Sequence, residues 1–371
     1  TVVAGLDTLP FSINLWRAKM VFLGGMGLIV LAVAVLPLLG VGGRQLFSAE
    51  SPGPIKETKL TPRMAQTAKG LWLIYLALAV ACTLGYVWAG MGWGDALVHM
   101  LTTLGLGGFS SHDASYAFFN SPRVEAVAIV FMTLAGMNFA THFMALQRRS
   151  LSFYWIDPEI RWYVGVMYAS VLGIALYLWW AGTFPDFLTA LRFSAFNTVS
   201  IATTTGFANT DYAQWPFFAP LWMLFLCSFV TCSGSTGGGL KMMRAVILYK
   251  QVFREITHAM HPNAMTFVKL GGSIVPNKII LAVLGFGFLY MASTIFFTLV
   301  LAASGIDIVS AFSAAVACFN NTGPGLGLVG PDSNYGVLND FQVCVCSFAM
   351  LLGRLEIFTL LVVLTPAYWR K

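Results

Sequence analysis

The sequence contains few charged residues for its length. Asp, Glu, Lys and Arg make up 10% of its 371 residues, whereas 58% are hydrophobic and the mean hydropathy is +0.77. Soluble domains carry roughly 25% charged residues. So few charges cannot cover a water-facing surface of this size, which argues against a soluble enzyme. Apolar runs of spanning length recur along the whole chain, which favours an integral membrane protein.

Histidine and cysteine are also scarce, with five and six residues respectively. The cysteines lie inside apolar runs without metal-ligand spacing, as small buried hydrophobic residues do. The histidines show no paired haem pattern across spans, and the His258–His261 pair has no carboxylate to complete a metal site. The sequence contains no Ser/His/Asp or HExxH arrangement. A membrane enzyme or a respiratory subunit is therefore the weaker alternative.

Apolar segments of two lengths alternate along the chain. Segments long enough to span a bilayer, at ~20 residues each, lie near 11–39, 64–92, 122–147, 160–182, 216–249, 275–304 and 339–365. Shorter apolar pieces lie near 94–104, 184–199 and 306–318, and a Gly-, Thr- or Asn-rich stretch follows each. Segments this short can be re-entrant.

The order of long span, short helix, loop and long span repeats. We predict an all-α membrane protein in which units 64–147, 160–250 and 275–371 follow the end of a first unit at 1–39. The expected architecture is a ring of four such units around one pore, with four-fold pseudo-symmetry. The chain opens in the middle of a motif, so we expect the opening half of the first unit to precede Thr1.

The charges have opposite signs on the two sides of the predicted spans. Basic residues gather in the connections around 40–63, 148–161 and 244–278, which predicts that these are cytoplasmic. Because the net charge of +6 is dispersed among them, nucleic acid is not the expected partner. The opposite side carries mainly acids, which concentrate cations at an entrance or are ordinary solvated loop charges: Asp7, Asp95, Asp113, Glu125, Asp186, Asp211, Asp307, Asp332 and Asp340.

The loops after the short helices carry the candidate chemistry. We align Gly107, Gly206 and Gly323, each just after a short helix ends. Rings of backbone carbonyls replace the water of a dehydrated cation, and glycine permits the backbone conformations that point carbonyls together. Irregular backbone at membrane depth is tolerated where it lines water or is buried in protein. Three surface turns are the alternative, but turns need no half-length apolar helix before them.

Several motifs resemble the TrkH family of bacterial potassium-uptake proteins. They are TLGLGGFSSHDASYAFFNS (103–121), TTTGFANTDYAQWP (203–216), CSGSTGGGLKMMR (232–244) and FNNTGPGLG (319–327), with GLDTLP (5–10) and LGGMG (23–27). The resemblance implies a first filter loop just before Thr1. It also implies potassium ligands at Gly105, Leu106, Gly107, Thr204, Thr205, Gly206, Asn321, Thr322 and Gly323. Family loops often have threonine where this chain has Leu106, and Pro324 predicts that the last loop differs in shape.

The span 216–249 contains Gly234, Gly237, Gly238 and Gly239. Each glycine costs about 1 kcal/mol in a helix relative to alanine, so the helix should break near mid-membrane. We predict a flexible gate loop below the filter, which the resemblance also implies. A glycine kink for close packing is the alternative.

Arg354 and Glu356 lie deep in the last predicted span, where charges are costly and usually functional. A pore-facing Arg354 would repel cations as an electrostatic barrier, and the resemblance supports this position. A structural ion pair is the alternative, although Glu356 is too close in sequence to be the partner of Arg354.

The resemblance also implies a homodimer in the bacterial inner membrane with a cytoplasmic nucleotide-binding regulatory subunit like TrkA. The basic connections could contact that subunit or acidic lipid head groups. A less selective Na⁺/K⁺ channel, or a potassium transporter coupled to H⁺ or Na⁺, remains an alternative.

Overall fold

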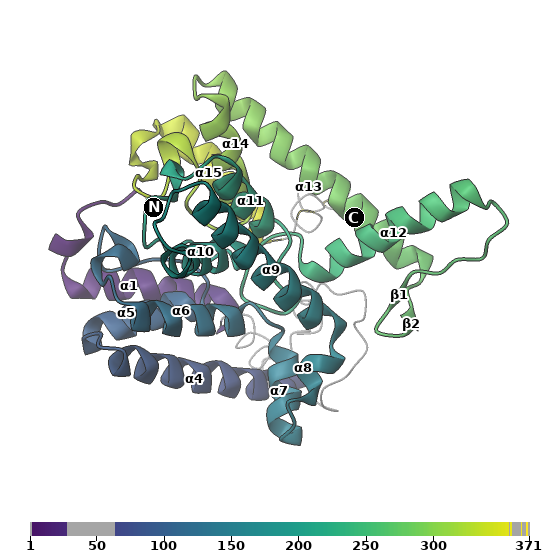
Figure 1. Ribbon diagram of the computed structural model, residues 1–371, viewed down its shortest axis with the longest axis horizontal. Helices are drawn as coiled ribbons and strands as arrows, with labels where there is room; N and C mark the ends of the chain where they lie inside the picture. The colour runs from purple at the N-terminus through teal and green to yellow at the C-terminus, as the bar shows by residue number, and fades with distance from the viewer. Residues whose placement is uncertain (1, 28–63, 356, 358–364, 366–368, 370–371) are drawn as a thin grey trace.

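The computed structural model describes residues 2–27, 64–355, 357, 365 and 369, and this part of the chain is almost entirely helical (Figure 1). The α-helices are α1 Phe11–Phe22, α4 Met64–Trp88, α5 Trp93–Leu104, α6 Pro122–Ala135, α7 Phe139–Arg148, α8 Ser152–Ile156, α9 Pro158–Trp180, α10 Phe187–Ala202, α11 Phe218–Cys227, α12 Met242–Met260, α13 Asn277–Ala303, α14 Ile308–Phe319 and α15 Asp340–Arg354. A π-helical turn, η2 Leu23–Gly27, follows α1, and short 3₁₀ turns η1 and η4–η7 lie in the connections. A small antiparallel hairpin, β1 Lys269–Leu270 and β2 Ser273–Ile274, completes the fold.

Among the described residues, three helices, α4, α9 and α13, are long and apolar enough to cross a membrane singly. Each is followed by a shorter helix that packs against it, as α5, α10 and α14 do. The neighbours α1, α5 and α4 lie side by side in Figure 1. The predicted alternation of long and short apolar segments is therefore present in the helices, within a mostly helical membrane-protein fold.

Two of the short helices, α10 and α14, are capped at their N-terminal ends by side chains that the sequence analysis assigned to a charged outer face. Asp186 accepts a hydrogen bond from the Thr189 amide at 2.7 Å, and Asp307 accepts one from the Ser310 amide at 3.0 Å. Such caps satisfy donors that a helix leaves unpaired. These acids thus fix where α10 and α14 begin.

Glu125 also departs from the predicted role of an outer-face charge. Its side chain is buried, and both of its carboxylate oxygens accept hydrogen bonds from Arg192, at 2.7 and 2.8 Å. This two-pronged pair joins α6 to α10, so Glu125 is a structural ion-pair partner.

The predicted span over 122–147 is not one straight helix. Helices α6 and α7 meet at an angle of 94° across a short break. Asn138 caps α7 by accepting a hydrogen bond from the Ala140 amide at 2.9 Å. Gly136 allows close packing at the bend, because a β-carbon there would lie 2.4 Å from the Tyr163 hydroxyl oxygen.

The predicted break in the span 216–249 is confirmed. Helix α11 ends at Cys227 and α12 begins only at Met242, with irregular backbone between them. Helix α12 continues past the predicted boundary to Met260. Parts of the first and last predicted spans, 28–39, 356 and 358–364, lie outside the described residues, as does the whole connection 40–63.

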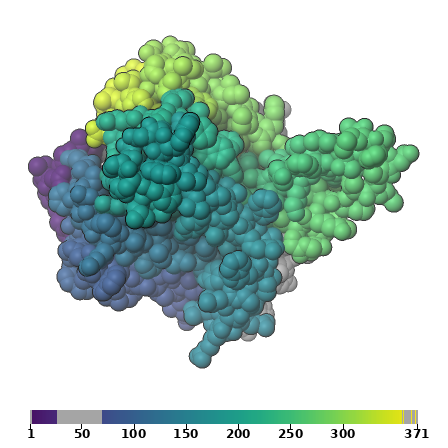
Figure 2. Space-filling view, in the orientation of Figure 1, coloured from purple at the N-terminus to yellow at the C-terminus, as the bar shows by residue number. Residues whose placement is uncertain are grey.

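Helix α12 and the β1–β2 hairpin form an arm that projects from the rest of the molecule (Figures 1 and 2). The largest hydrophobic core includes residues of α4, α5, α6 and the start of α9, among them the buried aromatics Tyr75, Tyr86, Tyr116 and Phe139. It extends into the base of the arm through Ile247 of α12 and Leu270 of β1. This core surrounds the loop that follows α5.

Candidate functional site

The loops that follow α5, α10 and α14 share one backbone structure. We name them loop A (Gly105–Gly108), loop B (Thr203–Gly206) and loop C (Asn320–Gly323). In each loop the third residue donates its amide hydrogen to a carbonyl five residues earlier, over distances of 2.8–3.0 Å. The pairs are Gly107 to Thr102, Thr205 to Ser200, and Thr322 to Ala317. Three segments far apart in sequence thus leave their helices in the same way.

The same backbone pattern corrects the predicted alignment. The second residue of each loop has a left-handed conformation, with φ of 48° at Leu106, 59° at Thr204 and 56° at Asn321. The fourth residue is a glycine with positive φ in each case. The equivalent glycines are therefore Gly108, Gly206 and Gly323, so the alignment of Gly107 was wrong by one residue. Loop A contains several glycines, and the sequence alone does not show which of them is equivalent to Gly206 and Gly323.

The correction moves the candidate ligands of loop A. Gly105, which we had included, corresponds to Thr203 and Asn320, the C-cap residues of α10 and α14. Gly107 corresponds to Thr205 and Thr322, so Gly107 is the position at which both other loops have threonine. Leu106 lies one position earlier and corresponds to Thr204 and Asn321.

The loops touch one another in chain order. A β-carbon on Gly108 would lie 2.2 Å from the Thr205 carbonyl oxygen, and one on Gly206 would lie 2.0 Å from the Thr322 carbonyl oxygen. Both glycines also have positive φ, which a residue with a side chain rarely adopts. The loops are therefore packed backbone against backbone at these positions.

The loops also contain main-chain acceptors that are not used internally. Within the described ranges, no hydrogen bond reaches the carbonyl oxygens of Leu106, Gly107, Gly108, Thr204, Thr205, Gly206, Asn321 and Thr322. Buried backbone groups are almost always paired. A group of carbonyls left unpaired beside one another is suited to receive an external electropositive partner, and a cation is one.

Side chains of the same residues are mostly engaged with the protein. The Thr205 and Thr203 hydroxyls lie 2.8 Å apart and share a hydrogen bond, and the Asn321 amide donates to the Met350 carbonyl at 3.2 Å. In loop C the Tyr335 hydroxyl donates to the Gly323 carbonyl at 2.8 Å. Most available ligands are thus main-chain oxygens, and the buried Thr322 hydroxyl, which has no partner among the described residues, is a side-chain oxygen beside them. Gly323 differs from Gly108 and Gly206 in already accepting a bond.

The glycine-rich segment Ser233–Gly239, which we call the glycine loop, lies against the beginnings of all three loops. Thr236 donates its hydroxyl hydrogen to the Leu104 carbonyl at 2.9 Å, next to loop A. The Gly238 amide donates to the Thr204 hydroxyl in loop B at 2.9 Å. A β-carbon on Gly238 would lie 2.0 Å from the Asn320 carbonyl in loop C. Glycine is therefore required at 238 by contact rather than by conformation.

Glu159, a residue that the sequence analysis missed, holds the start of the glycine loop and the first turn of α12, which follows that loop. Its Oε1 accepts hydrogen bonds from the amides of Ser233, at 2.7 Å, and Met243, at 3.0 Å. Glu159 is buried. Glu159 follows Asp157 and Pro158, as an ordinary acid in the first turn of a helix does. This pattern does not indicate a contact with the glycine loop, whose Ser233 lies 74 residues later.

The break between α6 and α7 supports the same loop. The Cys232 amide donates to the Gly136 carbonyl at 3.0 Å, and the Phe139 amide donates to the Gly234 carbonyl at 3.2 Å. Lys241, buried and with φ of 74°, donates from Nζ to the Gly237 carbonyl. The glycine loop is thus fixed by named contacts on several sides.

Arg354 bonds to main-chain carbonyls on two segments. Its guanidinium donates to Thr236 in the glycine loop at 3.0 Å, and to Gly24 at 2.6 Å and Gly25 at 3.3 Å in η2. The side chain lies on the wall of a cavity of about 550 Å³, which loops A and C also line. Glu356, the other charge predicted in this span, lies outside the described residues.

Asp7, Asp113 and His112 form a hydrogen-bonded network that joins the N-terminal segment to the chain after loop A. Asp7 pairs with His112, and the Asp113 amide donates to Asp7 at 3.2 Å. The hydrogen bond from His112, followed by that from the Asp113 amide, holds the pKa of the Asp7 carboxyl below its usual range. Asp113 in turn accepts from the Leu6 amide at 3.0 Å. These acids connect segments, and they also place negative charge near loop A.

Comparison with known proteins assigns the chain to a family. The family model TrkH, described as a cation transport protein, matches residues 1–371. The Trk system potassium uptake protein TrkH of Salmonella typhimurium is 46% identical over 371 residues, which cover 100% of this chain and 76% of that protein. The Trk system potassium uptake protein TrkG of Escherichia coli is 40% identical with the same coverage.

A solved structure agrees with these relatives. The crystal structure of the potassium transporter TrkH from Vibrio parahaemolyticus matches with a TM-score of 0.88 and 42% identity, and the match covers 100% of this chain and 76% of that one. A family of transport proteins also means that this is not an enzyme. The chain, with its repeated helix-and-loop units, belongs to the TrkH family of cation transport proteins.

Proposed function

We propose that this protein takes up potassium ions across the bacterial inner membrane through a selectivity filter of backbone carbonyls. The observation that supports this most directly is the set of unpaired carbonyl oxygens in loops A, B and C, which pack against one another in chain order. The relatives named as potassium uptake proteins support the choice of ion.

The proposed ligands are the carbonyl oxygens of the second to fourth residues of each loop. These are Leu106, Gly107 and Gly108, then Thr204, Thr205 and Gly206, then Asn321, Thr322 and Gly323. Carbonyl dipoles replace the hydration shell of the ion, yet they bind it more weakly than carboxylates and so permit exit. In this proposal loops A, B and C belong to the repeats 64–147, 160–250 and 275–371, which follow the end of a first repeat at 1–39.

The glycine loop and Arg354 form the proposed gate. The glycine loop lies across the beginnings of the three loops, and Arg354 ties it to η2 through charge-assisted hydrogen bonds. A positive charge at this place also opposes the passage of cations. Opening requires that the bonds from Arg354 to Thr236, and from Gly238 to Thr204, be broken.

We further propose that the protein works as a multi-pass homodimer with a TrkA-like, nucleotide-binding regulatory subunit on its cytoplasmic side. The basic residues in the connections around 148–161 and 244–278 support the assignment of that side. Family membership supports the assembly.

Ion flux into liposomes tests the proposal. Purified protein is reconstituted, and uptake is measured separately under K⁺, Na⁺ and proton gradients. Uptake driven by a K⁺ gradient, with slower Na⁺ uptake, is the expected result. Equal rates for both ions indicate a less selective channel, and uptake that requires a Na⁺ or proton gradient indicates coupled transport. Absence of flux of either ion in folded protein contradicts the proposal.

A further inference from the structure

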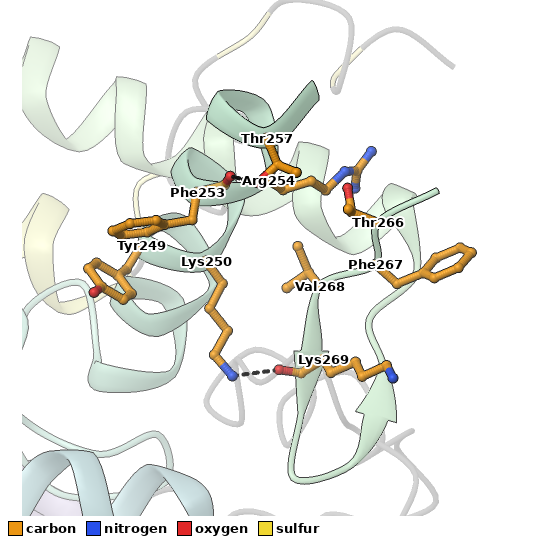
Figure 3. A pocket seen from close by; sticks show the side chains of 9 residues that line it. All are labelled: Tyr249, Lys250, Phe253, Arg254, Thr257, Thr266, Phe267, Val268 and Lys269. Carbon is orange, nitrogen blue, oxygen red and sulfur yellow. Dashed lines mark hydrogen bonds between the residues drawn. The ribbon is translucent and has the colours of Figure 1, made fainter. Parts of the chain in front are cut away.

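A pocket of about 370 Å³ lies between α12 and the β1–β2 hairpin, in the arm away from loops A, B and C (Figure 3). One wall comes from α12, residues 249–257, and the other from the strand side of the hairpin, residues 266–269. The proposed ion path and the gate do not use this pocket.

Among the described residues, those that line the pocket include cations but no acids. Lys250, Arg254 and Lys269 belong to the lining, whereas no Asp or Glu does. The nearest acid along α12, Glu255, accepts a hydrogen bond from Gln251 at 2.6 Å. The pocket is therefore electropositive, and an anion is the ligand that its charge favours.

Some hydrogen-bond donors at the pocket have no acceptor. Arg254 donates from Nη1 to Asn277 at 3.0 Å, but its buried Nε has no partner among the described residues. The buried hydroxyl of Thr266 is likewise unpartnered there. Lys250 directs one hydrogen to the Lys269 carbonyl at 2.7 Å (Figure 3), and an ammonium group has three. A phosphate group offers several strong acceptor oxygens for such donors.

An exposed apolar face of α12 borders the pocket. Tyr249, Phe253, Ile256 and Met260 are spaced by four, three and four residues, which places them on one side of the helix. All four are exposed, between 48% and 63%. In Figure 3 the rings of Tyr249 and Phe253 point away from the pocket on its α12 side. Aromatic and aliphatic side chains beside basic ones are typical of membrane-interface helices.

The pocket also lies at the end of a spanning helix. Arg254 bonds to Asn277, the first residue of α13, and α13 is long and apolar enough to cross the membrane. A ligand beside Arg254 is therefore placed at the level where a span leaves the hydrocarbon, which is the level of lipid head groups.

We propose that this pocket binds the phosphate head group of an anionic phospholipid, with the acyl chains along the face formed by Tyr249, Phe253, Ile256 and Met260. Lys250, Arg254 and the Thr266 hydroxyl contact the phosphate. A phospholipid fits both the basic pocket and the apolar face of α12, because one molecule carries an anionic phosphate and apolar chains.

Native mass spectrometry of the purified protein in detergent tests this. The added probes are phosphatidylglycerol and phosphatidylcholine with identical acyl chains. Phosphatidylglycerol should bind wild-type protein roughly ten-fold more tightly than phosphatidylcholine does, and the double variant Lys250→Gln, Arg254→Gln should lose that preference. Arg148→Gln removes an exposed basic residue outside the pocket and should leave the preference unchanged. Thermal unfolding establishes that each variant is folded.

Other results overturn the proposal. An equal preference in wild type and double variant excludes the pocket as the site. Displacement of phosphatidylglycerol by an equal concentration of inorganic phosphate identifies a free-anion site instead. The variant Tyr249→Ser, Phe253→Ser should weaken lipid binding. If it changes only the number of chains per particle, then the apolar face contacts a second copy and not lipid.

Discussion

The Thr204 hydroxyl accepts a hydrogen bond from the Gly238 amide at 2.9 Å and so joins loop B to the glycine loop. Thr204 is a proposed ion ligand and Gly238 belongs to the proposed gate. A movement of the glycine loop should therefore also affect loop B. The bond also leaves the Thr204 carbonyl oxygen available, since the side chain provides the acceptor.

Replacing Thr204 by valine should raise ion flux. Valine keeps the shape and branching of threonine but removes the acceptor for the Gly238 amide. A hydrogen bond of this kind contributes about 1 kcal/mol, so the closed position of the glycine loop should be favoured about five-fold less. The measurement is K⁺ uptake by liposomes. Thr204→Ser retains the hydroxyl and should behave like wild type; equal flux in all three proteins would show that this bond does not hold the gate.

Replacing Arg354 by glutamine should raise flux further. The change removes the positive charge and the bonds to Thr236 and Gly24, so both the barrier and the tie to η2 are weakened. Arg354→Lys keeps the charge without the planar set of donors. We expect the order glutamine, lysine, wild type, from fastest to slowest uptake. If lysine equals glutamine, the hydrogen bonds matter and the charge does not; a slower glutamine variant contradicts the gating role.

Replacing Glu159 by alanine should destabilise the protein. The change leaves the Ser233 and Met243 amides without their acceptor, and an unsatisfied buried donor costs about 1–3 kcal/mol. Glu159→Gln retains an acceptor oxygen and should lose much less. The temperature of unfolding in detergent measures both. Glu255→Gln changes an exposed acid on α12 and is the matched control; a similar loss in all three variants would remove the special role of Glu159.

The corrected register of loop A gives a direct test. Gly108→Ala should abolish selective uptake, because the new β-carbon would lie 2.2 Å from the Thr205 carbonyl oxygen and φ is 64°. Gly105→Ala should be milder, since φ there is −73° and the tightest contact, at 2.8 Å, is with the Val21 side chain.

The ratio of K⁺ to Na⁺ uptake is the measurement for both glycine variants. Gly173→Ala in α9 is the control, because no atom lies within 4 Å of the added carbon. A larger effect at Gly105 than at Gly108 would contradict the corrected register and return Gly105 to the candidate ligands.

The sequence by itself determined the classes of segment and their order. Length and hydropathy separate α4, α9 and α13 from the short helices, because a span of hydrocarbon requires a fixed number of apolar residues. The break before α12 was also predictable, since several glycines in a few positions oppose a helix locally. These are properties of neighbouring residues, and neighbouring residues are what a sequence shows.

Only the tertiary structure decided which residues meet. The choice of Gly108 over Gly107 depends on the φ angle and on contact with the Thr205 carbonyl of another repeat. The support of the glycine loop by Glu159, and the carbonyl partners of Arg354, join residues 74 to 330 positions apart. These hydrogen bonds depend on how the helices pack against one another, and the local sequence around each residue does not indicate that packing.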